Sequence, residues 1–309
     1  SKNKKRNLKI KKNQWLNNYL DATKLKEIDV VVELIGGAEG AAKKLVFNAL
    51  KNKKHVVTAN KALMAKYGDK LAKIAEKNKV NLEFEAAVCG GVPIIRSLKE
   101  GLIANKISKI YGILNGTSNY ILSSMDKHSK SFDEVLSDAN KAGYAEANPT
   151  ADLNGDDVGS KLKILSSLCF NSFISNNIYV EGIKDIDKDD INNANQLGYK
   201  IKLLGFAEFL NNKIYQRVHP TLIKKDSYIA SVDGVLNAVI VDGKPVGQSV
   251  IQGEGAGPAA TTSALISDIS SISRGNVKFP FSLSSKERKN IKYNNIGDRF
   301  FSAYLRFEV

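Results

Sequence analysis

Residues 28–88 alternate short apolar runs with longer amphipathic stretches, and this alternation restricts the fold more than any other feature of the chain. The apolar runs are "IDVVVELI" (28–35), "HVVTA" (55–59) and "VNLEFEAAV" (80–88), each short enough for a buried strand. The intervening stretches, 42–50 and 62–77, repeat apolar residues at helical spacing. Strand, helix, strand, helix, strand at this spacing predicts a parallel α/β unit.

The third apolar run alternates apolar and acidic side chains. We expect its two glutamates to lie on the opposite face from its apolar positions. The acidic pair is Glu83 and Glu85, and the inward set is Leu82, Phe84, Ala86 and Val88.

The pattern changes after "CGGVP" (89–93), where helices and strands no longer alternate regularly. The glycine loop "GEGAGP" (253–258) precedes a helix at 260–273, and the chain ends on "FFSAYLRFEV", which resembles a strand. Between residues 93 and 251 we expect both helices and strands. The expected helices are 93–104, 117–127, 132–142, 155–170 and about 189–195. The expected strands are 107–113, others within 178–218, and short ones within 228–251 joined by turns such as Asp242-Gly243.

The net charge of +14 raises the question of a nucleic-acid partner. Half of this charge comes from residues 2–12, which hold seven Lys or Arg and no acid. The remaining lysines are scattered among Asn and Ser without the aromatic residues of a base-stacking surface. A solvated lysine-rich surface is therefore the preferred interpretation, and nucleic-acid binding through residues 2–12 is the weaker one.

The chain has neither a membrane-spanning run nor the apolar core of a secretory signal in its opening residues. Its two cysteines, Cys89 and Cys169, are too few for a disulfide framework or a cysteine-rich metal site. These features favour a reducing compartment, and we expect a cytoplasmic protein without a membrane partner.

Residues 143–161, "GYAEANPTADLNGDDVGSK", concentrate acids in this basic chain. Asp156 and Asp157 fall in the first turn of the predicted 155–170 helix, with Asn154 as its N-cap, where acids complement the helix dipole. Asp157 and Lys161 are spaced i,i+4, and Lys161 lies at the rim of an apolar stripe. Burial favours the neutral form of Lys161, whereas the nearby Asp157 favours its charged form, and this balance suits a lysine that transfers protons. The alternative interpretation is that Asp157 and Lys161 form an ordinary surface ion pair.

Three further segments combine chemical groups with turns. Lys61 follows the 55–59 strand, at the edge where parallel sheets bind ligands, although a solvated lysine fits equally well. Glu85 precedes a glycine turn whose carbonyl groups, together with the carboxylate, suit a hard cation. The alternative is that this turn is only a flexible hinge. Asn115-Gly116-Thr117 opens a helix, where capping explains the residues and an exposed helix start could also bind a polar ligand.

Taken together, these segments resemble homoserine dehydrogenases. Residues 143–161 fit a signature of the form G-Y-x-E-x-x-P-x-x-D-x-x-G-x-D-x-x-x-K at every position. The resemblance covers about residues 9–275, through "VVTANKALMA" (56–65), "FEAAVCGGVPII" (84–95), "GILNGTSNYIL" (112–122), "GYKIKLLGFA" (198–207), "RVHPTLI" (217–223) and "GEGAG".

The resemblance implies nicotinamide-dependent interconversion of L-homoserine and L-aspartate 4-semialdehyde, in threonine and methionine biosynthesis. It implies that Lys61 and Lys161 are the catalytic lysines, one of them acting on the oxygen at C4. Asp157 would position Lys161. The substrate-binding set would be Glu146, Asp152, Asp157, Thr117 and Tyr144, with Glu146 and Asp152 at the amino end of the substrate.

The resemblance also implies NADP, or NAD, as cofactor, a monovalent cation that is expected to be sodium, and a homodimer. Residues 2–12 favour NADP weakly, because basic residues after a second strand can accept a 2′-phosphate. The cofactor-binding set would be Gly36, Gly37, Thr58, Ala59, Asn60, Lys61 and Gly257, and the cation set Glu85, Val88, Gly90 and Val92.

The implied fold is α/β: a partial Rossmann-type parallel sheet domain (1–88 and 252–275) with an α+β catalytic and dimerisation domain (89–251). Residues 276–309 would be a linker and the start of a truncated regulatory domain of the ACT type. The chain departs from the family pattern because the first βα unit with its G-x-G-x-x-G loop is missing. An inactive fragment that retains only substrate binding and dimer assembly is therefore the alternative function.

Overall fold

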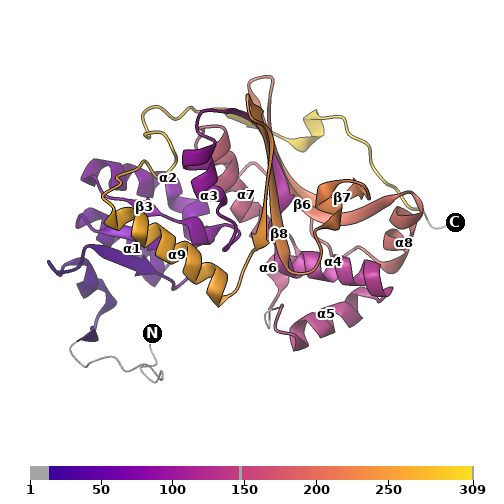
Figure 1. The fold of residues 1–309 in the computed structure, drawn as a ribbon, viewed down its shortest axis with the longest axis horizontal. Coiled ribbons are helices and arrows are strands. Elements are labelled where there is room, and N and C mark those ends of the chain that lie inside the picture. Colours follow the sequence, from indigo (N-terminus) through magenta and orange to yellow (C-terminus); the bar gives the residue numbers. More distant parts are fainter. Residues whose placement is uncertain (1–13, 146–147, 308–309) are drawn as a thin grey trace.

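The computed structural model describes residues 14–145 and 148–307, and it contains two units side by side (Figure 1). The first unit has a parallel sheet in the order β1 (Val30–Glu33), β2 (His55–Thr58), β3 (Leu82–Glu83). A short 3-10 helix, Tyr19–Thr23, precedes the sheet. The predicted succession of strands and helices over this region is confirmed.

Helices cover both faces of this parallel sheet. α1 (Ala41–Lys51) and α2 (Lys61–Asn78) pack on one face, where Val31 and Val56 belong to the main core. α9 (Pro258–Ser273) packs on the other face, where Val57 lies against Leu265 and Ile272. Alternate residues of the same strands therefore pack against the helices on opposite faces of the sheet, as expected of a buried parallel sheet.

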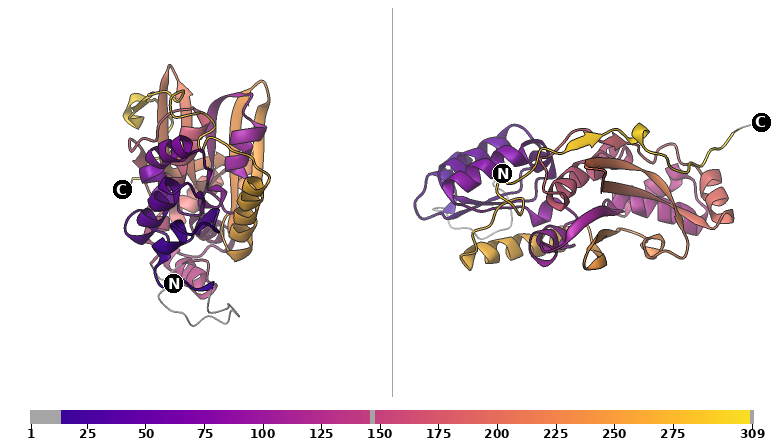
Figure 2. Two further views of the ribbon diagram at one scale, coloured as in Figure 1. Left: turned by 90° about the vertical axis from the view of Figure 1, so that its left-hand side faces the viewer. Right: turned by 90° about the horizontal axis from the view of Figure 1, so that it is seen from above.

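The second unit is built on a seven-stranded mixed sheet with helices over one face (Figures 1 and 2). The strand path is β10-β7-β6-β4-β8-β9, and β5 pairs with β7. Its strands are β4 (Lys106–Ile113), β5 (Tyr179–Val180), β6 (Tyr199–Leu210), β7 (Lys213–Lys224), β8 (Leu236–Lys244), β9 (Gly247–Glu254) and β10 (Lys292–Asn294). Its helices are α4 (Gly116–His128), α5 (Phe132–Lys141), α6 (Thr150–Leu153), α7 (Asp156–Cys169) and α8 (Lys188–Gln196).

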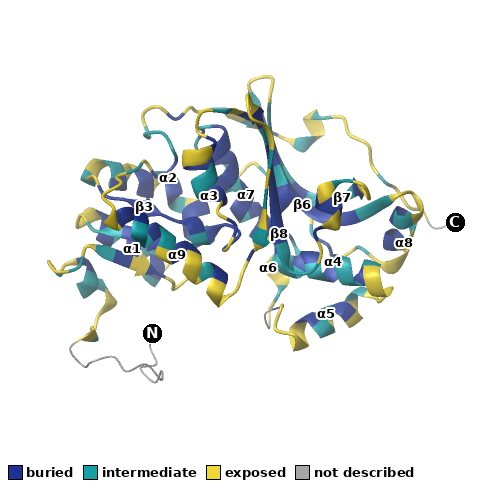
Figure 3. Ribbon diagram, viewed as in Figure 1, coloured by how far each residue is buried: buried dark blue, intermediate teal, exposed yellow. Residues whose placement is uncertain are grey.

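Helix α7 is the central helix of this unit, and it is dark blue along most of its length in Figure 3. Val158, Leu162 and Leu165 are fully buried in the core that joins both units. The 3-10 helix Tyr228–Ser231 covers part of the opposite face of the sheet, where Ile229 and Ile240 share a smaller core.

The chain passes between the units three times, and the first two crossings, after β3 and before α9, touch each other. Gly91 N–H donates to the Glu254 carbonyl at 2.9 Å, which joins the first crossing to the second. A Cβ at Gly90 would lie 2.9 Å from the Gly255 carbonyl oxygen, so a side chain there would force the two crossings apart. The glycines thus allow the two crossings to come into backbone contact.

The prediction for residues 80–88 was wrong in two respects. Only Leu82 and Glu83 form a strand, and Glu85–Ala87 forms a 3-10 helix. Glu83 and Glu85 are buried, at 6% and 4% exposure, because each has a polar partner further along the chain. Lys99 pairs with Glu83 at 2.9 Å, and the backbone N–H groups of Ile95 and Arg96 donate to Glu85.

Other local predictions also need correction. Gly155, with φ +84°, rather than Asn154, precedes α7, because residues 150–153 form the unpredicted short helix α6. Residues 93–104 form only α3 (Ile94–Arg96) and a π-helical turn (Ser97–Gly101).

The sheet region and the C-terminal tail differ from expectation too. Asp242-Gly243 lies within β8, and the reversal to β9 follows at the cis Lys244-Pro245 bond. The tail residues 301–307 have no strand conformation. Within the described residues, no helix combines the length and apolarity needed to cross a membrane.

We expect Lys99→Met to destabilise the protein strongly, because it leaves the Glu83 carboxylate buried without its counter-charge. Removing one partner of a buried pair costs about 3–5 kcal/mol of unfolding free energy, measurable by chemical denaturation. The double variant Glu83→Leu/Lys99→Met should recover much of this loss. Lys130→Met, which breaks the exposed pair with Asp138, is the control and should change little. Equal stability of the two Lys→Met variants would contradict the prediction.

Candidate active site

The buried carboxylate of Asp157 joins two of the predicted functional lysines. Its Oδ1 lies 2.6 Å from Lys61 Nζ, and its Oδ2 lies 2.7 Å from Lys161 Nζ. The three side chains differ in exposure: 44% for Lys61, 10% for Lys161 and 3% for Asp157. One lysine is thus open to solvent and the other enclosed, and they share one carboxylate.

The two lysines come from different units of the fold. Lys61 is the first residue of α2, directly after the end of β2, and the Asn60 side chain caps the helix by accepting from Leu63 N–H at 3.0 Å. Asp157 and Lys161 lie one turn apart on α7. The ion pair between Lys61 and Asp157 therefore crosses the boundary between the α/β unit and the mixed-sheet unit.

Burial and charge act in opposite directions on this cluster. Burial alone would raise the pKa of Asp157, but the Lys161 and Lys61 ammonium groups hold it well below its usual range. Burial alone would lower the pKa of Lys161, but the Asp157 carboxylate outweighs this effect and the pKa is raised. Both groups are charged at neutral pH in this arrangement.

These shifts make the pair a stabilising element over a wide pH range. The contribution of Asp157, whose pKa is depressed, is present above its ordinary value of 3.8 and is lost as pH falls through the folded-state pKa. The contribution of Lys161, whose pKa is raised, is present below its ordinary value of 10.5 and is lost as pH rises through the folded-state pKa.

The turn after β4 supplies the remaining contacts of the cluster. The Leu114 carbonyl accepts a hydrogen bond from Lys161 Nζ at 2.6 Å. Asn115 Nδ2 donates to Asp152 Oδ1 at 2.7 Å and to Asp157 Oδ2 at 2.9 Å. Asn115 thereby brings Asp152 to the cluster.

Asn115 was considered from sequence only as a helix cap, and its link to the carboxylates was missed. It does cap α4, because its Oδ1 accepts from Ser118 N–H at 2.8 Å. The same amide therefore both caps a helix and joins two acids. The strand–Asn–helix pattern marked the position, but the sequence distance of 37 residues to Asp152 concealed the contact.

The two other predicted substrate residues in the described chain lie beside this turn. Thr117 Oγ1 donates to the Tyr144 carbonyl at 2.9 Å, which ties the first turn of α4 to the 143–145 segment. The Tyr144 ring is 47% exposed and lies 4.9 Å, between centroids, from the Tyr120 ring. Glu146 lies outside the described residues.

The predicted cofactor residues of the α/β unit gather at the carboxyl ends of β1 and β2. Asn60 Nδ2 donates to the Gly37 carbonyl at 2.7 Å, and Ala59 N–H donates to the Glu33 carbonyl at 3.4 Å. The Glu33 carboxylate, which sequence reasoning did not single out, accepts from Gly36 N–H at 3.0 Å and from Thr58 Oγ1 at 2.6 Å. Ligands bind at this edge in parallel α/β sheets.

Gly257 is placed apart from this group. It precedes α9 with φ +108°, next to the second crossing between the units. Its helix packs on the opposite face of the sheet from α2.

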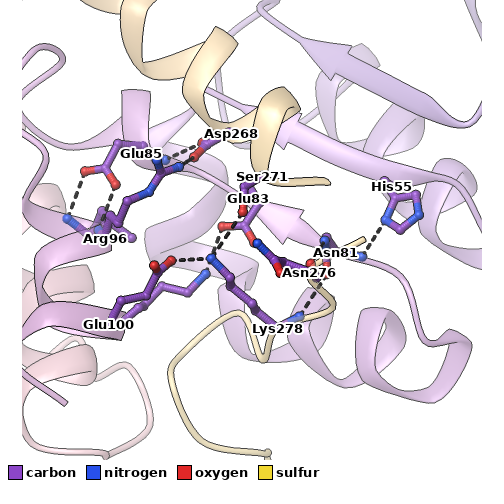
Figure 4. A network of polar contacts seen from close by, with 12 residues as sticks. His55, Asn81, Glu83, Glu85, Arg96, Glu100, Asp268, Ser271, Asn276 and Lys278 are labelled. Carbon is purple, nitrogen blue, oxygen red and sulfur yellow. Dashed lines mark hydrogen bonds and ion pairs between the residues drawn. The ribbon is translucent and has the colours of Figure 1, made fainter. Parts of the chain in front are cut away.

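The predicted cation residues lie along residues 85–92, at the first crossing, and Glu85 belongs to the polar network in Figure 4. Glu85 accepts from Ile95 N–H at 2.9 Å and Arg96 N–H at 2.7 Å, and burial raises its pKa to about 7. Burial also raises the pKa of the neighbouring Asp268 to about 6. Across residues 14–145 and 148–307, no three His, Cys, Asp or Glu side chains form a metal-binding group, so a cation here would need carbonyl ligands.

A hollow of about 400 Å³ opens near the start of α7, where Asn154, Asp156 and Lys184 contribute to its lining. Neither Lys61 nor Lys161 lines it. The chemistry-bearing cluster is therefore distinct from this hollow.

Comparison with known proteins assigns the family. Residues 93–270 match the model described as homoserine dehydrogenase, and residues 1–85 match the homoserine dehydrogenase NAD-binding domain. The chain belongs to the homoserine dehydrogenase family. The recognition made from the 143–161 signature is thereby confirmed, as is the mixed α/β fold class.

Several named homoserine dehydrogenases are similar to this chain. A relative from Neisseria gonorrhoeae is 50% identical over 250 residues, which cover 81% of this chain and 57% of the relative. One from Pseudomonas aeruginosa is 47% identical over 82% of this chain and 58% of its own length. This chain thus spans less than two thirds of both relatives.

Solved structures show the same similarity. A homoserine dehydrogenase from Thiobacillus denitrificans matches with a TM-score of 0.87 and 45% identity, over 90% of this chain and 66% of its own. A hyperthermophilic archaeal homoserine dehydrogenase, solved in complex with NADPH, matches with a TM-score of 0.75 and 25% identity, over 86% of this chain and 77% of its own.

We expect Asp157→Asn to lower the pKa of Lys161, because burial then acts without the opposing carboxylate. Carbon-13 NMR titration of the lysine side chains would measure it, with Lys161→Arg used to assign the resonance. Asp156→Asn, in the same helical turn but exposed, is the matched control and should leave that pKa in place. An unchanged Lys161 titration in Asp157→Asn would refute the assignment of Asp157 as the source of the shift.

Proposed function

We propose that this chain is the catalytic part of a homoserine dehydrogenase that interconverts L-homoserine and L-aspartate 4-semialdehyde with a nicotinamide cofactor, in threonine and methionine biosynthesis. The observation that carries the proposal is the Lys61–Asp157–Lys161 cluster at the junction of the two units. Family membership supports it, because Asp157 and Lys161 fall on the 143–161 signature and Lys61 lies in the resembling segment 56–65. The protein is proposed to be cytoplasmic, in keeping with its free buried cysteines.

The lysines are proposed to handle the proton at the C4 oxygen. Reduction of an aldehyde to an alcohol places a proton on that oxygen, and a positioned ammonium group can donate it. Lys61 is half-exposed and Lys161 enclosed, so Lys61 can exchange its proton with solvent more readily. Asp157 holds both ammonium groups near one point, and it raises the pKa of Lys161, which keeps that lysine charged.

The acids near the cluster are proposed to bind the amino end of the substrate. A substrate ammonium group needs a carboxylate partner when it leaves water. Asp152 is suited to this because Asn115 orients one of its oxygens. Glu146 is proposed as its partner, with Thr117 and Tyr144 at the same side of the site.

NADP or NAD is proposed to bind at the carboxyl edge of β1 and β2, where it supplies the hydride. The residues proposed to hold it are Gly36, Gly37, Thr58, Ala59, Asn60, Lys61 and Gly257. Their fit rests on positive-φ glycines after β1 and on the N-terminus of α2 at the same edge. The NADPH complex of the archaeal relative supports a nicotinamide cofactor.

A sodium ion is proposed at the first crossing, bound by the Glu85 carboxylate and the carbonyls of Val88, Gly90 and Val92. Burial raises the pKa of the Glu85 carboxyl group, and this carboxylate has no ion-pair partner within residues 14–145 and 148–307, which suits a cation held mainly by oxygen atoms. Such an ion would stiffen the two touching crossings.

A homodimer is proposed through the face of the mixed sheet that the helices leave open. Tyr111 and Phe206 lie on that face with ring centroids 5.9 Å apart, the Arg217 guanidinium covers the Phe206 ring at 4.2 Å, and Val250 is 40% exposed. Aromatic and arginine side chains of this kind are enriched at protein interfaces.

We expect this chain to oxidise NADPH in the presence of L-aspartate 4-semialdehyde, and Lys161→Ala to lower kcat by about 10²–10⁴-fold, the usual contribution of a general acid. Absorbance at the nicotinamide band measures both. Lys163→Ala, on the same helix but bonded to Asn176, is the matched control and should retain activity. NADPH binding without turnover in the parent chain would instead favour the inactive-fragment alternative.

We expect sodium to stabilise the protein at pH 8, relative to an equal concentration of tetramethylammonium. The raised Glu85 pKa means that stability falls as pH rises from its ordinary value of 4.5 to about 7, and bound sodium would offset this loss above pH 7. Near saturation, each tenfold increase in sodium should add about 1.4 kcal/mol to the unfolding free energy.

The sodium experiment has two variants that separate the site from general salt effects. Glu85→Gln should abolish the difference between the two salts in thermal melts. Glu100→Gln, on the neighbouring π-helical turn but outside the proposed ligand set, should preserve it. Identical melting curves of the parent chain in both salts would contradict a sodium site.

A further inference from the structure

Residues 279–294 run across both units after α9, along one edge of the molecule in the right-hand view of Figure 2. Phe281 is fully buried, and its ring lies 5.4 Å from that of Phe84 in the α/β unit. Ser285 Oγ donates to Glu76 on α2 at 2.8 Å. Further along, β10 pairs in parallel with β7 of the mixed sheet. The segment therefore binds to both units.

Arg288 is the buried link of this segment, at 4% exposure. Its Nη2 lies 2.8 Å from Asp69 Oδ1 on α2 and 2.7 Å from Ser167 Oγ on α7. The same nitrogen donates to the Ser172 carbonyl just beyond α7 at 2.5 Å. A single nitrogen thus connects the helix that begins with Lys61 to the helix that carries Lys161.

Aromatic rings hold the rest of the guanidinium group. Its central carbon lies 4.3 Å from the Phe281 ring centroid and 4.9 Å from that of Phe173. Nε and Nη1 are buried without a hydrogen-bond partner in the described part of the chain, which is unfavourable for stability. An apolar side chain would avoid this cost, so stability alone does not account for an arginine here.

Arg288 and Asp157 join the same two helices at separate places. Asp69 follows Lys61 by eight residues on α2, or about 12 Å at 1.5 Å per residue. Ser167 follows Asp157 by ten residues on α7, or about 15 Å. Two linked points along a helix pair restrict rotation as well as separation, whereas Asp157 alone restricts only the active-site end.

We propose that Arg288 is a positioning residue that fixes α2 against α7 and so sets the placement of Lys61 relative to Lys161. It touches neither lysine and acts through the two helices. This inference rests on the proposed function for its effect on turnover, but its structural content is independent of activity.

The structural content is tested by the distance between the units. Lys70 on α2 and Lys184 in the mixed-sheet unit are both exposed, so Lys70→Cys/Lys184→Cys accepts spin labels, while the native Cys89 and Cys169 are buried. Electron spin resonance should give a narrow distance distribution in this background. Adding Arg288→Met should broaden or shift it, and Arg288→Lys, which keeps the charge facing Asp69, should restore part of the narrow component.

Arg299→Met is the matched control for this measurement. Arg299 belongs to the same C-terminal tail, but it pairs with Glu208 on β6 and lies near the Tyr215 ring, so it does not reach α2. Its loss should leave the distance distribution unchanged. An equally narrow distribution in folded Arg288→Met would overturn the proposal. Should Arg288→Met fail to fold, Asp69→Asn, at the partly exposed partner, takes its place with the same expected broadening.

The effect on turnover separates this proposal from the proposed function. A displacement of about 1 Å can cost about 10²-fold in rate, so kcat should fall by tenfold or more in Arg288→Met. The Kd for NADPH should change less than twofold, because the proposed cofactor residues at the carboxyl edge of β1 and β2, Lys61 included, belong to the same unit as α2 and keep their arrangement relative to one another when α2 moves against α7. If the parent chain is active and Arg288→Met has the same kcat, the positioning role is overturned. If the parent chain is inactive, the proposed function is refuted, and the distance measurement alone decides whether Arg288 fixes α2 against α7.

Discussion

The fold depends on one buried carboxylate, that of Asp157, which forms ion pairs with two lysine ammonium groups. Asp157 is nearly inaccessible, and a buried carboxylate without counter-charges would be costly. Lys161 satisfies it from within α7, and Lys61 does so from the other unit. Because neither lysine has another acid within ion-pair distance among the described residues, the position of α2 relative to α7 is tied to the charge balance of this one side chain. The proposed active site and one of the contacts that hold the two units together are therefore the same interaction.

Near this cluster, glycines allow two backbone segments that cross between the units to lie in direct contact. Gly90 and Gly91 allow the first crossing to contact the second, with Gly91 N–H bonded to the Glu254 carbonyl. Glu85 then bonds the start of α3 on the far side of the same crossing. A hinge with short, mutually bonded crossings permits little sliding between the units. The remaining freedom is rotation about the crossings, and contacts away from the hinge, such as Arg288 with Asp69, restrict that rotation.

The sequence allowed much of the architecture to be predicted, because its signals were local. Apolar runs and helical spacing located β1, α1, β2 and α2 to within a few residues, and the i,i+4 spacing joined Asp157 to Lys161. What it could not reveal were pairings set by tertiary contact. Glu83 looked solvent-facing because its partner Lys99 lies 16 residues away on an irregular turn. Asn115 looked like a cap, which it is, but its two carboxylate partners are 37 and 42 residues further along.

Four buried cations join separate segments of this chain. Lys99, Lys161, Lys202 and Arg288 are each less than a tenth exposed. Each joins separate segments: Lys99 a turn to β3, Lys161 a helix to the Leu114 carbonyl, Lys202 β6 to Asp233, and Arg288 the tail to α2. Apolar residues of similar size often stabilise such positions better, so the placement of these four cations at contacts between segments points to the value of a fixed arrangement. In the proposed reaction one of the two lysines acts on the oxygen at C4, so a fixed arrangement of α2 and α7 is the property most directly linked to its rate.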